Sequence, residues 1–130
     1  CRLESLWQAV GAETYRMSAA EHDAVFAAVS HMPHLLAFAF VHQILDHPAG
    51  QTYLKFAATG FRDFTRIASS HPAIWTDICF ANRGSLLKLL EGQQRQLEKI
   101  AGLLRNGNSD GLYRYFAEAK QTRDDWLERQ

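Results

Sequence analysis

The sequence predicts an all-α fold, and three observations support this class. Apolar residues recur every three or four positions through most of the chain, which is the period of an amphipathic helix. Only three prolines and eight glycines interrupt the 130 residues. Hydrophobic residues make up 47% of the chain, enough for the core of one ordinary domain and too many for a disordered chain. One short stretch, residues 12–17, alternates weakly like a strand.

The first elements are marked by clear start and stop signals. Residues 3–10 have helical spacing, and Gly11 follows at the position where helices commonly end. Ser18 and Glu21 form a Ser-x-x-Glu capping box that predicts the start of a long helical segment over residues 20–46. Pro33 lies in the middle of this segment, and it predicts a kink or break near residues 30–32.

The second half of the chain predicts two short helices and then longer ones. Residues 47–50 read as a loop, followed by short helices over 51–58 and 61–69. Ser70-His71-Pro72 predicts a helix start, and the apolar spacing then continues to Arg105. Residues 106–108 end that helix, and Ser109 or Asp110 would cap a last helix.

The length of the predicted helix over residues 72–105 has a consequence for assembly. A single helix of this length would extend about 50 Å, whereas a compact domain of this size is about 36 Å across. An overhanging amphipathic helix needs a partner, so we expect a homodimer formed through the long helices. The alternative is a break at Gly84 or Gly92 that folds the helix back.

Charge and cysteine content exclude several classes of partner. The chain has 14 basic and 14 acidic residues, and this balance argues against nucleic acid or an anionic membrane as a partner. Two cysteines are too few for a disulfide framework. We therefore expect a cytoplasmic protein. The first residue is Cys1 rather than methionine, which suggests a fragment or a processed chain.

The six histidines all fall within residues 22–71, and the tightest group is Ser30-His31-Met32-Pro33-His34. This group lies at the expected kink, where unpaired backbone groups and converging side chains suit a polar site. Two histidines three residues apart can share a metal ion, but no acidic residue stands nearby as a third ligand. A structural role is the alternative, with His31 at the kink and His34 in the core.

A second group is Gly60-Phe61-Arg62-Asp63-Phe64-Thr65-Arg66. On a helix, Arg62 and Arg66 share one face, and two guanidinium groups beside aromatic residues can hold a carboxylate or phosphate. The alternative is a solvated basic face with a local ion pair between Asp63 and Arg66. The sequence has no P-loop, no G-x-G-x-x-G and no nucleophile elbow.

Several motifs together resemble prephenate/arogenate (cyclohexadienyl) dehydrogenases. The resemblance covers nearly the whole chain and keeps the order of the family's motifs. The most specific blocks are Ser30-His31-x-Pro33-His34 and Gly60-Phe61-x-Asp63-Phe64-Thr65-Arg66, supported by Leu6-Trp7-x-x-x-Gly11-Ala12, His22-Asp23 and Trp75-x-Asp77-Ile78.

The resemblance implies that the chain is the C-terminal part of a two-domain enzyme. Members of the family bind NAD or NADP through an N-terminal Rossmann domain, which also carries the catalytic histidine. Their C-terminal domain is helical, like that of 6-phosphogluconate dehydrogenase, and it forms the dimer. On this basis residues 1–17 would be a remnant of the nucleotide-binding domain, its last helix and strand, and residues 18–130 the helical substrate-binding and dimerisation domain.

The family reaction is oxidative decarboxylation of prephenate, or of its amine analogue arogenate, in tyrosine biosynthesis. By motif match, Arg66 would pair with a substrate carboxylate, Asp63 would orient the arginine or gate the entrance, and Trp75 would form a wall. Ser30, His31 and His34 would line the pocket. The general base would lie outside this chain, no metal is expected, and the chain alone should be inactive. The alternative is a stand-alone helical dimerisation or regulatory module without catalysis.

Overall fold

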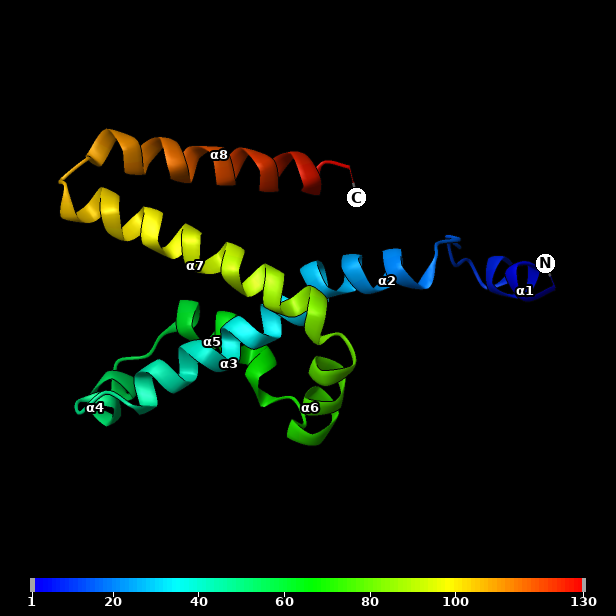
Figure 1. The fold of residues 1–130 in the computed structure, drawn as a ribbon, viewed down its shortest axis with the longest axis horizontal. Coiled ribbons are helices and arrows are strands. Elements are labelled where there is room, and N and C mark those ends of the chain that lie inside the picture. Colours follow the sequence, from blue (N-terminus) through cyan, green and yellow to red (C-terminus); the bar gives the residue numbers. More distant parts are fainter. Residues whose placement is uncertain (1, 130) are drawn as a thin grey trace. The chain divides into compact units, whose positions relative to one another are not determined.

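The computed structural model describes residues 2–129, and this part of the chain is helical throughout, with no strand. The chain divides into two compact units, Cys1–Leu87 and Lys88–Gln130. The expectation of an all-α fold is confirmed. Figure 1 shows the order of the helices along the chain.

The N-terminal segment forms one helix, followed by a stretch without regular secondary structure. Helix α1 (Arg2–Ala9) is followed by Gly11, whose φ of 83° is a left-handed conformation that glycine adopts without strain. The following residues, 12–17, form neither a helix nor a strand, and their origin as the last strand of a nucleotide-binding domain stays a prediction. Arg16 forms a two-point ion pair with Glu4, with nitrogen–oxygen distances of 2.5 and 2.6 Å.

A continuous helical segment runs from residue 19 to residue 45. It consists of α2 (Ala19–Phe26), a π-helical turn η1 (Ala27–His31) and α3 (Met32–Leu45). The capping box is confirmed, because the Ser18 hydroxyl accepts from the Glu21 N–H and the Glu21 carboxylate accepts from the Ser18 N–H. Pro33 is accommodated at the start of α3 by the π-helical turn rather than by a chain break.

The run over residues 19–45 is also, by length and composition alone, apolar enough to cross a membrane, with a mean hydropathy of 1.7. Helices α4 (Gly50–Lys55) and α5 (Thr59–Thr65) and the 3-10 turn η2 (Arg66–Ser69) all pack against α3. The central helix of a helical domain has this same composition. The expectation of no membrane association stays a prediction.

Gly50 makes the turn from α3 into α4 sterically possible. A β-carbon at this position would lie 2.1 Å from the carbonyl oxygen of Ile44, which no side chain can tolerate. The buried glycine therefore lets the chain reverse directly after α3. This reversal brings α4 against the helix it has just left.

The predicted single helix over residues 72–105 was wrong. Helix α6 (Pro72–Ala81) ends at Asn82, and α7 (Arg83–Arg105) begins at the next residue. The break lies two residues before Gly84, one of the two positions expected to allow it, while Gly92 lies within α7. Asn82 is 9% exposed, and its side-chain amide donates to the carbonyl of Asp23 on α2 at 2.7 Å. This hydrogen bond ties the break to α2, while the Asn82 N–H still donates to the Ile78 carbonyl and the Asn82 carbonyl accepts from the Leu86 N–H.

In the second unit, the last part of α7 and helix α8 (Ser109–Leu127) form an antiparallel hairpin (Figure 1). The cap of α8 is Asn108, whose side chain accepts from the Gly111 N–H at 2.8 Å, rather than Ser109 or Asp110. Tyr115 donates to the Gln96 side chain at 3.0 Å and so joins the two helices.

Candidate functional site

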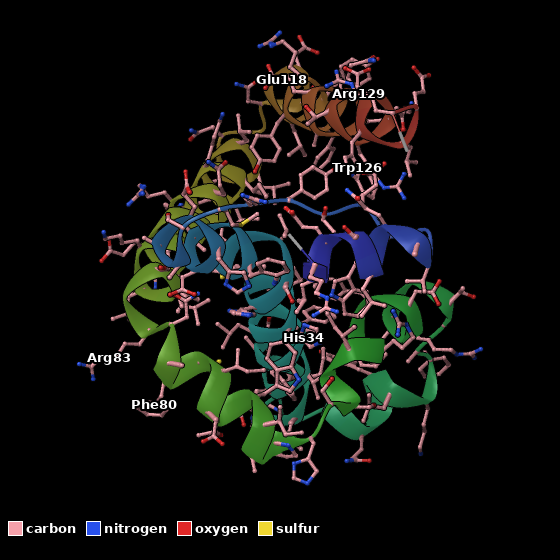
Figure 2. The ribbon with its side chains drawn as sticks, turned by 90° about the vertical axis from the view of Figure 1, so that its right-hand side faces the viewer. His34, Phe80, Arg83, Glu118, Trp126 and Arg129 are labelled. Atoms are coloured by element: carbon pink, nitrogen blue, oxygen red, sulfur yellow. The ribbon has the colours of Figure 1, made fainter. Side chains whose placement is uncertain are left out.

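Three of the predicted site residues meet where α3 packs against α6. The imidazole of His34 stacks on the indole of Trp75, with ring centroids 3.6 Å apart. His31 meets the same indole edge-on, with centroids 6.1 Å apart. All three side chains are half-buried, and Figure 2 shows His34 within the first unit.

Ser30, the fourth predicted residue of this group, fixes the orientation of His34. The Nδ1 of His34 lies 3.0 Å from the carbonyl oxygen of Ser30, one helical turn earlier. Because a carbonyl oxygen only accepts, Nδ1 must carry the proton in this contact. In the neutral ring, Nε2 is then an acceptor. The π-helical turn and the indole therefore hold one defined tautomer of His34.

His31 carries a buried nitrogen without a partner. Among the described residues, Nδ1 of His31 forms no hydrogen bond although it is excluded from solvent. A buried polar atom without a partner is rare in folded proteins and costs about 1–3 kcal/mol. His31 also belongs to a π-helical turn, a feature that is frequently found at functional sites. Both observations favour a ligand-binding role for His31 over a purely structural one.

Trp75 also forms part of an apolar pocket of about 310 Å³ between α3 and α6. The pocket is lined by Leu35, Phe38, Pro72, Trp75, Thr76, Cys79 and Phe80. Burial raises the pKa of the Cys79 thiol, so this cysteine is a neutral apolar group at pH 7. The pocket therefore offers an apolar wall rather than a nucleophile.

The predicted arginine lies in a separate pocket of about 500 Å³ on the face of α5 and η2. It is lined by Ala57, Ala58, Phe61, Arg62, Thr65, Arg66 and Ser69. Within residues 2–129, neither Arg66 nor Arg62 forms an ion pair or a side-chain hydrogen bond. The alternative of a local Asp63–Arg66 ion pair is therefore not what the structure shows.

Asp63 is exposed and is not among the residues that line either pocket. The structure brings Ser30, His31, His34 and Trp75 together, while Arg66 belongs to η2, which packs against α3.

Three features were not predicted from the sequence: the π-helical turn, the Asn82 hydrogen bond and the apolar pocket. Pro33 was the available signal for the first of these.

The described residues do not provide a nucleotide or a metal site. No three His, Cys, Asp or Glu side chains within residues 2–129 lie close enough together to hold a metal ion. A dinucleotide site needs a glycine-rich turn between a strand and a helix, and this part of the chain has no strand. The described residues therefore do not fit NAD or NADP.

Comparison with known proteins places the chain in a family. The family model described as "Prephenate dehydrogenase, dimerization domain" matches residues 18–118. Prephenate dehydrogenase of Bacillus subtilis (strain 168) is 40% identical over 126 residues, which cover 95% of this chain and 33% of the relative. Cyclohexadienyl dehydrogenase of Zymomonas mobilis is 31% identical over 119 residues, covering 90% of this chain and 41% of the relative.

Solved structures agree with the sequence relatives. Arogenate dehydrogenase of Synechocystis superposes with a TM-score of 0.87 at 26% identity, over 96% of this chain and 46% of that one. Prephenate dehydrogenase from A. aeolicus, in complex with hydroxyphenyl propionate and NAD+, superposes with a TM-score of 0.86 at 35% identity. That match covers 95% of this chain and 44% of the other.

These relatives are dehydrogenases, and the chain spans 33% to 41% of the length of the two curated ones described above. The family model covers most of the chain, from the capping box at Ser18 into α8. This chain therefore belongs to the prephenate dehydrogenase family and corresponds to its dimerisation domain.

Proposed function

We propose that this chain is the C-terminal, substrate-binding and dimerisation part of a cytoplasmic prephenate dehydrogenase of tyrosine biosynthesis. The full enzyme would convert prephenate to 4-hydroxyphenylpyruvate and carbon dioxide, and it would pass a hydride to NAD+ or NADP+. The nucleotide and the general base would be held by residues outside this chain, because the described residues do not fit a dinucleotide. Alone, the chain would bind and dimerise but not catalyse.

The observation that carries the proposal is the unpaired guanidinium of Arg66, on the turn that packs against the histidine-bearing helix α3. Guanidinium is planar and grips a carboxylate at two points, and prephenate carries two carboxylates. The half-buried indole of Trp75 and the fixed ring of His34 supply a flat surface for a cyclohexadiene ring. The unpaired nitrogen of His31 supplies a polar contact beside it.

The dimer is supported by apolar side chains that this chain leaves exposed. In the second unit, Leu97 is 55% exposed, Phe116 54% and Trp126 55%. Large apolar side chains at this exposure are typical of a surface that a second copy covers. The family's own description as a dimerization domain supports the same assembly.

The proposal is tested with the full-length protein that contains this chain. Prephenate and NAD+ or NADP+ should give absorbance at the reduced nicotinamide band together with equimolar 4-hydroxyphenylpyruvate. The 130-residue chain, assayed under the same conditions, should give neither product. Failure of the full-length protein to turn over prephenate or arogenate with either nucleotide would contradict the proposal and favour a non-catalytic helical module.

A further inference from the structure

The pocket on α5 and η2 contains two arginines, and the proposed function uses only one of them. Arg62 and Arg66 stand one helical turn apart and line the same pocket of about 500 Å³. Like charges at this spacing repel one another and destabilise a helix slightly. No acidic side chain among the described residues lines this pocket.

Asp63 is an acidic residue of the same described segment, and it forms no ion pair with either arginine. Asp63 follows Arg62 directly and lies three residues before Arg66, a spacing at which helical side chains can pair. The carboxylate is exposed and lies outside the pocket lining, and it forms no ion pair among residues 2–129. The described lining of the pocket therefore contains two positive charges and no negative one, together with Thr65 and Ser69.

We propose that Arg62 is a specificity-determining residue that makes the enzyme prefer a substrate with two uncompensated negative charges. This inference rests on the proposed function. Prephenate has a ring carboxylate and a pyruvyl carboxylate, so its net charge is −2. Arogenate replaces the keto group with an ammonium group, so its net charge is −1.

The preference follows from electrostatics at a shared pocket. Arg66 can neutralise one carboxylate in either substrate, and so it distinguishes them weakly. A second guanidinium attracts the remaining carboxylate of prephenate, whereas in arogenate it also repels the neighbouring ammonium group. Because Arg62 is exposed, its effect is moderate and sensitive to salt.

The test compares the two substrates in the full-length enzyme. Arg62→Gln should raise the KM for prephenate about three- to tenfold and leave kcat within about twofold, as expected for loss of binding at an exposed charge. The KM for arogenate should change by about twofold or less, so the ratio of the two kcat/KM values falls. Arg62→Lys should restore most of the ratio, because it keeps the charge.

Arg83→Gln is the matched control, since Arg83 is an exposed arginine of the same unit whose side chain points outward from the ribbon in Figure 2. It should leave both KM values unchanged. An independent measurement needs no variant: raising the ionic strength should reduce the preference of the unmodified enzyme for prephenate.

Equal changes for both substrates in Arg62→Gln, or no change in either, would overturn this inference while the proposed function stands. Turnover of neither substrate by the unmodified enzyme would overturn the proposed function and this inference with it. A preference for prephenate that ignores ionic strength would also contradict the role of Arg62.

Discussion

The imidazole of His34 and the indole of Trp75 lie face to face, with their planes 20° apart. One ring comes from α3 and the other from α6, so the stack joins two helices that are separated in the sequence by α4, α5 and η2. The Ser30 carbonyl holds the other edge of the imidazole. His34 is thus fixed by neighbours before any ligand arrives, which lowers the ordering cost of binding.

His31 should show opposite effects on stability and on binding. Replacing it in His31→Phe removes the buried Nδ1 that has no partner and keeps a flat ring against Trp75. We expect the free energy of unfolding to rise by about 1 kcal/mol, because an unpaired buried polar group is lost. The KM for prephenate should rise at the same time. Thermal unfolding and steady-state kinetics check the two effects, and a loss of stability together with an unchanged KM would contradict this role of His31.

Asn82 should be the polar residue on which the break between α6 and α7 depends. Asn82→Ala removes its hydrogen bond to the Asp23 carbonyl and should lower the free energy of unfolding by about 1–3 kcal/mol. Asn106→Ala, an exposed asparagine just after α7, should change it by about 0.5 kcal/mol or less. Denaturant titrations give both values. Equal effects would mean that the buried hydrogen bond contributes nothing particular to the fold.

The capping box should make stability depend on pH in the acid range. Hydrogen bonds from Ser18 lower the pKa of Glu21 below its ordinary value of 4.5. A lowered folded-state pKa stabilises the fold fully above the unfolded-state value, and this stabilisation is lost as the pH falls through the folded-state value. Glu21→Gln keeps the capping geometry but removes the ionisable carboxylate. The melting temperature of this variant should therefore fall less than that of the unmodified protein between pH 6 and about 3. Parallel pH profiles for the two proteins would contradict this role.

The exposed apolar side chains of the second unit should be required for dimerisation. Leu97→Glu places a charge at one of these exposed positions, and we expect it to shift the protein to monomers at micromolar concentration, since a charge buried in an interface opposes association. Arg95→Glu, an exposed polar position on the same helix, is the control and should remain dimeric. Sedimentation velocity distinguishes the species. A stable monomer in the unmodified protein would refute the dimer itself.

Local sequence signals predicted the helix starts and stops that depend only on neighbouring residues. The capping box at Ser18, the stop at Gly11 and the helix start at Pro72 are formed by side chains and dihedral angles within one turn. The break at Asn82 could not be predicted in this way. It depends on a hydrogen bond to Asp23, which is distant in the sequence, and apolar spacing continues unchanged across it.

The candidate site was predictable in its members but not in its arrangement. The motifs named His31, His34 and Trp75, and the structure brings these three together. Arg62 was noted from helical spacing, but only the structure shows that it shares a pocket with Arg66 and that Asp63 does not. Periodicity gives the face of a helix, whereas a shared pocket depends on the preceding loop at Ala57 and Ala58.

The role of Arg66 in binding a substrate carboxylate is the central claim. Steady-state kinetics of Arg66→Ala and Arg66→Lys in the full-length enzyme test it most directly. Arg66 is exposed in this chain, as Arg62 is, so the alanine variant should lose about 1.5–3 kcal/mol of substrate binding, the usual contribution of hydrogen bonds to charged groups. This loss should be seen mainly as a KM raised roughly tenfold to a hundredfold. Lysine should recover only part of the loss, because it keeps the charge without the two-point grip. A near-normal KM for Arg66→Ala would contradict the claim and the assignment of the site.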